Sequence, residues 1–277
     1  MKLVLQGPSL EPTLIASLIS GINVTNYHQP RQNVWHINGV PEDQYDIIAS
    51  FANENKADFA LINTSQKLSD YKLVAMDMDS TFIQIECIDE IADYCGVKEQ
   101  VAAITAASMR GELDFNESLL QRVALLEGLE ESALQAVYDE RLKLSTGAEE
   151  MLQALQKANI KTLLVSGGFT FFTDRLKQKY HLDFTRANEL EIVDGKLTGR
   201  IIGEIVNAEV KARTLIDCCN KSGISLTETI AIGDGANDLK MMALAGLSVA
   251  HHAKPKVKQH AKVAFDYSGM DGVLNLF

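Results

Sequence analysis

Apolar and polar positions divide the chain into two parts with different patterns. Over residues 1–70, short apolar runs alternate with amphipathic segments, which predicts a small α+β domain. The expected order is βαββαβ, with strands and helices near residues 3–5, 11–19, 23–27, 34–37, 42–55 and 59–62. The polar stretch over residues 63–70 is the natural boundary, so we expect a second domain over residues 71–277.

The pattern of the second part is typical of a parallel sheet with helices on both faces, a Rossmann-like α/β fold. Apolar strands are expected at residues 73–76, 162–165, 229–232 and 247–250. The helical pattern between the first two strands is longer than one crossover helix needs, which predicts an inserted helical cap over about residues 84–144. Asp194 and Gly195, between alternating segments, predict a β-hairpin.

Composition adds that the chain is an ordinary globular protein with an acidic balance. It has 277 residues, 46% of them hydrophobic, and a net charge of -11. Apolar runs fall short of the ~18 residues of a membrane span, and the start lacks the apolar core of a secretory signal, so we expect a cytoplasmic protein without a membrane partner. The negative charge argues against a nucleic-acid partner. The four cysteines lack metal-site spacing and are expected to be reduced packing residues.

The first candidate site lies where the strand at residues 73–76 ends. Asp77 and Asp79 follow it, at the carboxyl end of a buried strand, where open α/β sheets bind ligands. A spacing of two brings both carboxylates to one side, where they repel each other and call for a cation or a shared proton. Mg²⁺ fits because it takes hard oxygen ligands and leaves places for water and phosphate. An N-cap and turn with solvated acids is the alternative interpretation.

A second cluster follows the strand at residues 229–232 and reads Gly233-Asp234-Gly235-Ala236-Asn237-Asp238. Its acids would supply the remaining metal ligand. A dinucleotide-binding fingerprint does not fit, because that motif requires glycine where Asp238 stands. A glycine turn without a ligand is the other interpretation.

Two further candidates lie between these clusters. Ser166, Gly167 and Gly168 follow a strand and begin a helix, where a hydroxyl and backbone amides favour an anion. A helix N-cap is the commoner role of such a serine. Lys211 lies near the start of another helix, where a cation is locally unfavourable. One interpretation is that another group holds it, and the other is an ordinary solvated lysine.

In this order the four elements resemble the haloacid dehalogenase superfamily. The D-x-D-x-T motif corresponds to residues 77–81, the strand-end serine to Ser166, the lysine to Lys211, and the G-D-x-x-x-D acids to Asp234 and Asp238. Over nearly all of residues 72–277 the resemblance extends to the phosphoserine phosphatase family, through these motifs and through Glu86, Met109, Arg110, Gly111, Phe115, Arg122 and Phe169. The order of elements in the first part resembles an ACT domain, by topology alone.

The resemblance implies a Mg²⁺-dependent phosphatase that converts O-phospho-L-serine to L-serine and phosphate, the last step of serine biosynthesis. It implies that Asp77 forms an aspartyl-phosphate and that Asp79 acts as acid and base. It assigns Mg²⁺ to Asp77, the Asp79 backbone carbonyl and Asp234, with Asp238 orienting the site. The substrate contacts that it implies are Glu86, Met109, Phe115, Arg122, Ser166, Gly167, Lys211 and Asn237.

Helical spacing gives an independent argument for this substrate. Phe115, Leu119, Arg122 and Leu126 share one face of a predicted helix, so a guanidinium lies on an apolar stripe. A desolvated arginine needs an anion, which a substrate carboxylate would provide, and Glu86 would take the substrate ammonium. The alternatives are an internal ion pair or a snorkelling side chain for Arg122, and a helix-dipole partner for Glu86.

Three other functions are compatible with these residues. No residue excludes transfer of the phosphoryl group to another alcohol such as homoserine, and a phosphatase for a different small phosphomonoester would share the motifs. A non-catalytic phosphoacceptor or ligand-binding module would explain Asp77 but not the cap, Lys211 or the Asp234 cluster. A homodimer formed through the first part is an expectation by analogy alone.

Overall fold

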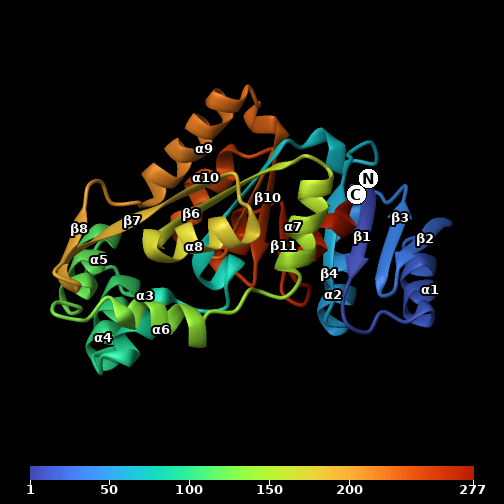
Figure 1. The fold of residues 1–277 in the computed structure, drawn as a ribbon. Coiled ribbons are helices and arrows are strands. Elements are labelled where there is room, and N and C mark those ends of the chain that lie inside the picture. The colour runs from blue at the N-terminus through green and yellow to red at the C-terminus, as the bar shows by residue number, and fades with distance from the viewer.

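The computed structural model describes residues 1–277 and contains two sheets, each with its own helices (Figure 1). The N-terminal unit, blue in Figure 1, has the predicted order βαββαβ. Its elements are β1 (Lys2–Gln6), α1 (Pro12–Gly21), β2 (Asn26–Arg31), β3 (Val34–Asn38), α2 (Tyr45–Glu54) and β4 (Asp58–Ile62). β2 begins later than the segment expected at residues 23–27, because it is a fully exposed edge strand without apolar alternation.

Different parts of the chain cover the two faces of this antiparallel sheet, whose strand order is β2-β3-β1-β4. Side chains alternate along a strand, so Leu3 and Leu5 pack in the cluster formed with α1 and α2, whereas Val4 points to the opposite face. That face packs against the C-terminal segment Met270–Leu276, which joins the same core cluster as Val4. The two ends of the chain therefore lie side by side (Figure 1).

The second sheet has seven strands in the order β11-β10-β9-β5-β6-β7-β8. They are β5 (Leu73–Met76), β6 (Lys161–Phe169), β7 (Phe184–Val193), β8 (Lys196–Ile202), β9 (Thr229–Gly233), β10 (Leu247–His251) and β11 (Val263–Phe265). Neighbouring strands pair in parallel, except that β7 and β8 form the antiparallel hairpin predicted at Asp194 and Gly195. The expected Rossmann-like α/β fold is confirmed, and β11 is a strand that the sequence pattern does not predict.

Helices cover both faces of this sheet. On one face lie α7 (Ala148–Lys157) and α8 (Thr170–Tyr180), and on the other lie α9 (Ala208–Ser222), α10 (Leu239–Leu244) and α11 (Pro255–His260). In β5, Val74 and Met76 join the first core cluster, and Leu73 and Ala75 join the second. All four side chains are completely buried, as expected for a central parallel strand. β5 is therefore a rigid base for the residues that follow it.

Four helices inserted between β5 and β6 form the expected cap, at the lower left of Figure 1. They are α3 (Cys87–Tyr94), α4 (Lys98–Met109), α5 (Phe115–Ala124) and α6 (Ser132–Glu140). The chain enters and leaves the cap through adjacent segments, because Ile83 and Leu144 form a bridge and the Gln84 N–H donates to the Lys143 carbonyl at 2.9 Å. α5 packs against β8, so the hairpin supports the cap from the side of the sheet.

Buried polar contacts fix the docking of the N-terminal unit. The two carboxylate oxygens of Asp58 accept hydrogen bonds from the backbone N–H groups of residues 266–268, in the loop after β11. Gln6 donates to the Gly272 carbonyl at 3.3 Å and accepts from the Asn275 side chain at 2.7 Å. These bonds hold the unit at the end of the molecule away from the cap (Figure 1).

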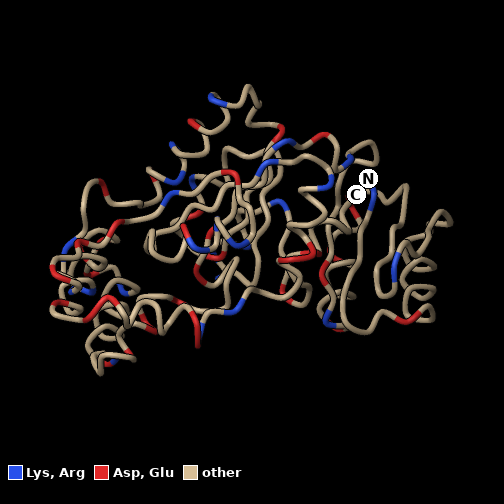
Figure 2. Tube along the Cα trace, viewed as in Figure 1, with Lys and Arg blue, Asp and Glu red and all other residues tan.

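Charged residues of both signs are interspersed along the chain (Figure 2). None of the helices combines the length and the apolar composition that crossing a membrane requires. The four cysteines are free thiols, three of them buried.

Candidate active site

Asp77 directly follows β5 and begins an irregular turn, Met78–Phe82. Its side chain is almost fully buried, and its Oδ1 accepts a hydrogen bond from the Met78 N–H at 2.7 Å. Within the turn, Ser80 has a φ of +55°, in the left-handed region that few residues other than glycine adopt. This tight turn presents both Asp77 and Asp79 to one cavity.

Lys211 is the buried cation of the site. It lies near the start of α9, whose N-terminus is capped by the Asn207 side chain. Its side chain has no exposed surface, and Nζ lies 2.6 Å from Asp77 Oδ1 and 2.8 Å from Asp238 Oδ1. Burial lowers the pKa of Lys211, but the carboxylates of Asp238 and Asp77 outweigh burial and raise that pKa overall. Lys211 is therefore paired with anions and is not a solvated lysine.

The acids around Lys211 carry more negative charge than one lysine balances. Oxygen atoms of Asp77, Asp234 and Asp238 lie within 4.8 Å of one another. Burial raises the pKa of Asp77 and of Asp234, and the nearby Asp238 carboxylate raises both further. Asp238 is already engaged, because Oδ1 accepts from Lys211 and Oδ2 accepts from the Gly235 N–H at 3.0 Å. Asp77 and Asp234 are left to hold a hard divalent cation, which this donor set fits.

Asp79 lies against the end of β6, where the strand bulges at residues 166–168. Its Oδ2 accepts from the Ser166 hydroxyl at 3.2 Å, and its Oδ1 accepts from the Cys87 N–H at 2.9 Å. A Cβ at Gly168 would lie 2.5 Å from Asp79 Oδ2, so only glycine allows the strand to come this close. Burial raises the pKa of Asp79, although its hydrogen bonds oppose the shift. The protonated form of this carboxyl is thereby favoured.

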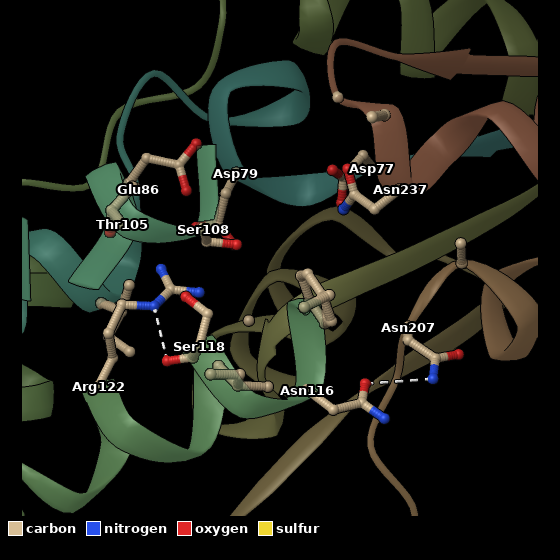
Figure 3. A pocket seen from close by; sticks show the side chains of 18 of the residues that line it. Asp77, Asp79, Glu86, Thr105, Ser108, Asn116, Ser118, Arg122, Asn207 and Asn237 are labelled. Atoms are coloured by element: carbon tan, nitrogen blue, oxygen red, sulfur yellow. Dashed lines mark hydrogen bonds between the residues drawn. The ribbon is translucent and has the colours of Figure 1, made fainter. Parts of the chain in front are cut away.

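Core and cap enclose a cavity of about 860 Å³. Figure 3 shows Asp77 and Asn237 on one side of it, and Glu86 and Arg122 on the other. The sequence-predicted residues that line it are Asp77, Asp79, Glu86, Met109, Phe115, Arg122, Gly167, Asp234 and Asn237. Ser166, Lys211 and Asp238 are buried directly behind its wall.

Two of the predicted substrate contacts differ in their surroundings. Met109 ends α4 with 73% of its surface exposed, so it lies at the rim of the cavity. Phe115 packs on Gly167, where a Cβ would lie 2.9 Å from the aromatic ring. Phe115 therefore closes the cap onto the bulged end of β6 that carries Ser166.

Arg122 faces the cavity from α5 without an acidic partner. Its only hydrogen bond within the protein runs from Nε to the Ser118 carbonyl at 3.3 Å (Figure 3). The internal ion pair that the sequence leaves open is therefore not formed. Burial lowers the pKa of Arg122, opposed by the more distant carboxylates of Asp89 and Glu86. A half-buried guanidinium with unused donors favours an anionic ligand.

Glu86 precedes α3, lines the cavity and is exposed to solvent there. Burial raises the pKa of Glu86 to about 7, and the Asp79 carboxylate adds to the shift. Its Oε1 accepts from the Ser80 hydroxyl at 2.7 Å. An ammonium group beside Glu86 would offset this loss of solvation. The cap thus presents one acid suited to a cation and one arginine suited to an anion.

The structure also brings in residues to which the sequence assigns no role. Thr81 is completely buried, and its hydroxyl donates to Asp234 Oδ1 at 2.9 Å, so it joins the two acidic clusters. Its position in the motif at residues 77–81 is the feature of the sequence that could have indicated this role. Asn207 donates to Asn116 at 3.2 Å and thereby connects core to cap (Figure 3). Polar residues near helix starts usually act as caps, so no sequence pattern marks this pair.

An α/β core with an inserted helical cap, and with aspartates and a buried lysine at the strand ends beneath it, defines a hydrolase of the haloacid dehalogenase type. The family model described as haloacid dehalogenase-like hydrolase matches residues 71–246, and the chain belongs to this family.

Relatives with a more specific name cover most of the chain. A phosphoserine phosphatase from Polaromonas sp. is 55% identical over 215 residues, which are 76% of this chain and 91% of that protein. The structure of a probable phosphoserine phosphatase from Vibrio cholerae has a TM-score of 0.86 at 37% identity and covers 99% of this chain and 85% of that chain. A structure described as a phospho-aspartyl intermediate analogue of phosphoserine phosphatase has a TM-score of 0.70 at 38% identity, over 76% of this chain and 100% of that chain.

Proposed function

We propose that this protein hydrolyses O-phospho-L-serine to L-serine and phosphate with Mg²⁺, the last step of serine biosynthesis. The cap side of the cavity carries the proposal, because Glu86 and Arg122 face it without oppositely charged partners. Asp77 and Lys211 lie on the core side. A phosphomonoester with an ammonium and a carboxylate at its other end matches this arrangement. Similarity to proteins named phosphoserine phosphatase supports the same substrate.

Asp77 is the proposed nucleophile. One of its carboxylate oxygens bonds to phosphorus while the bond between phosphorus and the serine oxygen breaks, which leaves an aspartyl-phosphate and L-serine. Water then attacks the same phosphorus, phosphate departs, and the Asp77 carboxylate is restored. Lys211 favours the ionised form of Asp77, since its ammonium lies 2.6 Å from Oδ1.

Asp79 is the proposed acid and base. Its proton goes to the departing serine oxygen in the first displacement, and it takes a proton from the attacking water in the second. The raised pKa of Asp79, caused by burial, suits the first role. The hydrogen bonds from Ser166 and Cys87 fix the plane of its carboxyl group.

The charge of the phosphoryl group is balanced by Lys211, the Ser166 hydroxyl and nearby backbone amides. Asp77, the Asp79 backbone carbonyl and Asp234 are the proposed Mg²⁺ ligands, and the ion when bound supplies further positive charge there. Asp238 holds Lys211 and the Gly235 N–H in place. Asn237, at the core side of the cavity (Figure 3), is proposed to donate to a phosphate oxygen. Met109 and Phe115 are proposed to enclose the substrate from the cap.

The setting of the reaction is part of the proposal. The substrate is a small molecule, and we expect the protein to act in the cytoplasm. A homodimer through the N-terminal unit stays a prediction.

Incubation of the purified protein with O-phospho-L-serine and MgCl₂ tests this function. L-serine and phosphate should appear in equal amounts, chelation with EDTA should stop the reaction, and added Mg²⁺ should restore it. The same incubation with homoserine separates hydrolysis from transfer, because phosphoryl transfer would yield a new phosphoester and less phosphate than serine. Absence of phosphate release with Mg²⁺ present contradicts the proposal.

Replacing Arg122 with methionine is expected to lower kcat/KM for phosphoserine by about 10- to 100-fold, mainly through KM. The reason is the loss of a charge-assisted contact to the substrate carboxylate, worth roughly 1.5–3 kcal/mol. Arg110→Met is a matched control, because Arg110 pairs with Glu112 on the exposed surface of the cap and should leave both constants unchanged. Steady-state kinetics that show equal effects for the two variants would remove Arg122 from the site.

Acidification below about pH 7 is expected to weaken phosphoserine binding, because Glu86, with a pKa raised to about 7, then loses the charge that attracts the ammonium. The kcat/KM for phosphoserine should therefore fall as the pH decreases through that value. 3-Phosphoglycerate, which has no ammonium, is the control, since its phosphate ionises similarly but has no need of Glu86. Parallel pH profiles for both substrates would argue against this role.

A further inference from the structure

A chain of hydrogen bonds leads into the active site from Asn188, in β7. This residue is only 1% exposed and does not line the cavity. Its Nδ2 donates to the Gly167 carbonyl at 2.7 Å, and its Oδ1 accepts from the Val206 N–H at 2.8 Å. Because one partner is an acceptor and the other a donor, the orientation of the Asn188 amide is determined.

The next link is the peptide between Gly167 and Gly168. A peptide is planar, with its C=O and N–H on opposite sides, so a fixed Gly167 carbonyl also fixes the direction of the Gly168 N–H. That N–H donates to Ser166 Oγ at 2.8 Å. Since Oγ accepts there, its own hydrogen is directed to Asp79 Oδ2, which lies 3.2 Å away.

β6 bulges at residues 166–168, where its pairing with β7 is irregular. The pairing of β6 with β7 is regular up to Val165 and resumes only at Phe169, which pairs with Asn188 itself. The intervening Gly167 and Gly168 are conformationally free residues, and their close contacts with Phe115 and Asp79 exclude larger side chains. Asn188 therefore supplies a bond where the strand ladder is interrupted.

The Oδ1 atom of Asn188 connects the same amide to the segment that leads to Lys211. Val206, whose N–H it accepts, lies just before Asn207, the N-cap of α9. α9 carries Lys211, which contacts Asp77. One buried amide thus holds the bulge of β6 beside Asp79 and the segment that leads to Lys211 in a fixed relation.

We propose that Asn188 is a positioning residue for this reaction: through the Gly167–Gly168 peptide and the Ser166 hydroxyl, it orients Asp79 to protonate the leaving group. The inference rests on the proposed function, in which Asp79 is the acid. A displaced Asp79 would still border the cavity, but its proton would not be aimed at the departing oxygen.

The dependence of the rate on the leaving group tests this role, because kcat/KM covers the steps up to the aspartyl-phosphate. A basic leaving group needs a proton from Asp79, whereas 4-nitrophenolate leaves readily without one. Asn188→Ser, which lacks the amide donor, should lower kcat/KM for phosphoserine and phenyl phosphate about 10-fold or more, and for 4-nitrophenyl phosphate far less. Across a series of aryl phosphates, kcat/KM should fall more steeply with leaving-group basicity than in the unmodified protein.

Gln6→Ser is the matched control. Gln6 is likewise a buried amide that donates to a backbone carbonyl, that of Gly272, but it lies at the docking face of the N-terminal unit. Its substitution should leave the leaving-group dependence unchanged. In a Ser166→Ala background, the chain of hydrogen bonds is already broken. There, Asn188→Ser should change the dependence of kcat/KM on leaving-group basicity only slightly.

Several results would overturn the inference. An equal loss of kcat/KM for all leaving groups would show that Asn188 does not act through Asp79. The same conclusion would follow if kcat/KM depended on leaving-group basicity as it does in the unmodified protein. If Asn188→Ser fails to fold, Asn188→Asp serves for the same plot, since it keeps an acceptor for Val206 and loses the donor to Gly167. An unmodified protein that does not hydrolyse phosphoserine would instead refute the proposed function and leave this geometry unexplained.

Discussion

Replacing Asp77 with asparagine is expected to reduce kcat for phosphoserine by at least about 10⁴-fold, the scale of loss seen when a nucleophile is removed. The amide cannot form the aspartyl-phosphate, whereas the shape of the side chain is kept. Folding should be little affected. Burial raises the pKa of Asp77 because it disfavours the ionised carboxyl, so a neutral amide is tolerated at this position, and Lys211 retains its contact with Asp238. Phosphate release gives the rate, and rapid acid quenching with radiolabelled phosphoserine shows whether the protein carries a covalent phosphoryl group.

Asp174→Asn is the control for this substitution, because Asp174 is an exposed residue of α8 outside the cavity. It should retain full turnover and the covalent label. Turnover by Asp77→Asn, or labelling to the same extent as in the unmodified protein, would contradict the role of Asp77 as nucleophile.

Replacing Lys211 with methionine is expected to have the second largest effect, on both activity and stability. Loss of a preorganised cation at the phosphoryl group should lower kcat by roughly 10²- to 10³-fold. The completely buried carboxylate of Asp238 and the nearly buried one of Asp77 would lose their common partner, which should reduce the free energy of unfolding by about 3–5 kcal/mol. Urea denaturation without metal measures this loss, and Mg²⁺ should recover part of it by binding the same acids.

Lys240→Met is the matched control for stability. Lys240 pairs with Glu209, but both side chains are exposed. Replacing Lys240 should therefore lower the free energy of unfolding by no more than about 1 kcal/mol. Equal losses in the two variants would mean that the buried pairs around Lys211 contribute no more than a surface ion pair. A Lys211→Met variant with normal kcat would remove the lysine from the mechanism.

The sequence predicts the catalytic core well because its strands are apolar throughout. β5 has the predicted bounds, and β9 and β10 each extend one residue beyond them, since parallel strands buried on both faces read as continuous apolar runs. β2 and β11 are less predictable for physical reasons. β2 is exposed along its whole length, and β11 is only three residues long, so neither leaves a clear period in the sequence.

The candidate site, too, is only partly predictable from the sequence. Motif spacing at strand ends predicts which acids line the cavity, because parallel strands end at one edge of the sheet. It does not reveal that Lys211 joins Asp77 and Asp238, or that Asn188 holds Gly167, since those contacts bridge elements far apart in the chain. Side-chain reach across a folded core depends on packing that no local pattern records.

The relative kcat/KM for O-phospho-L-serine, phosphoethanolamine and 3-phosphoglycerate, measured by phosphate release with Mg²⁺, shows whether the cavity recognises both charged groups of phosphoserine. Phosphoethanolamine lacks the carboxylate assigned to Arg122, and 3-phosphoglycerate lacks the ammonium assigned to Glu86. The kcat/KM for phosphoserine should exceed both other values by at least about 10-fold, because each missing charged contact costs roughly 1.5–3 kcal/mol. Equal values for the three substrates would contradict this recognition of both groups.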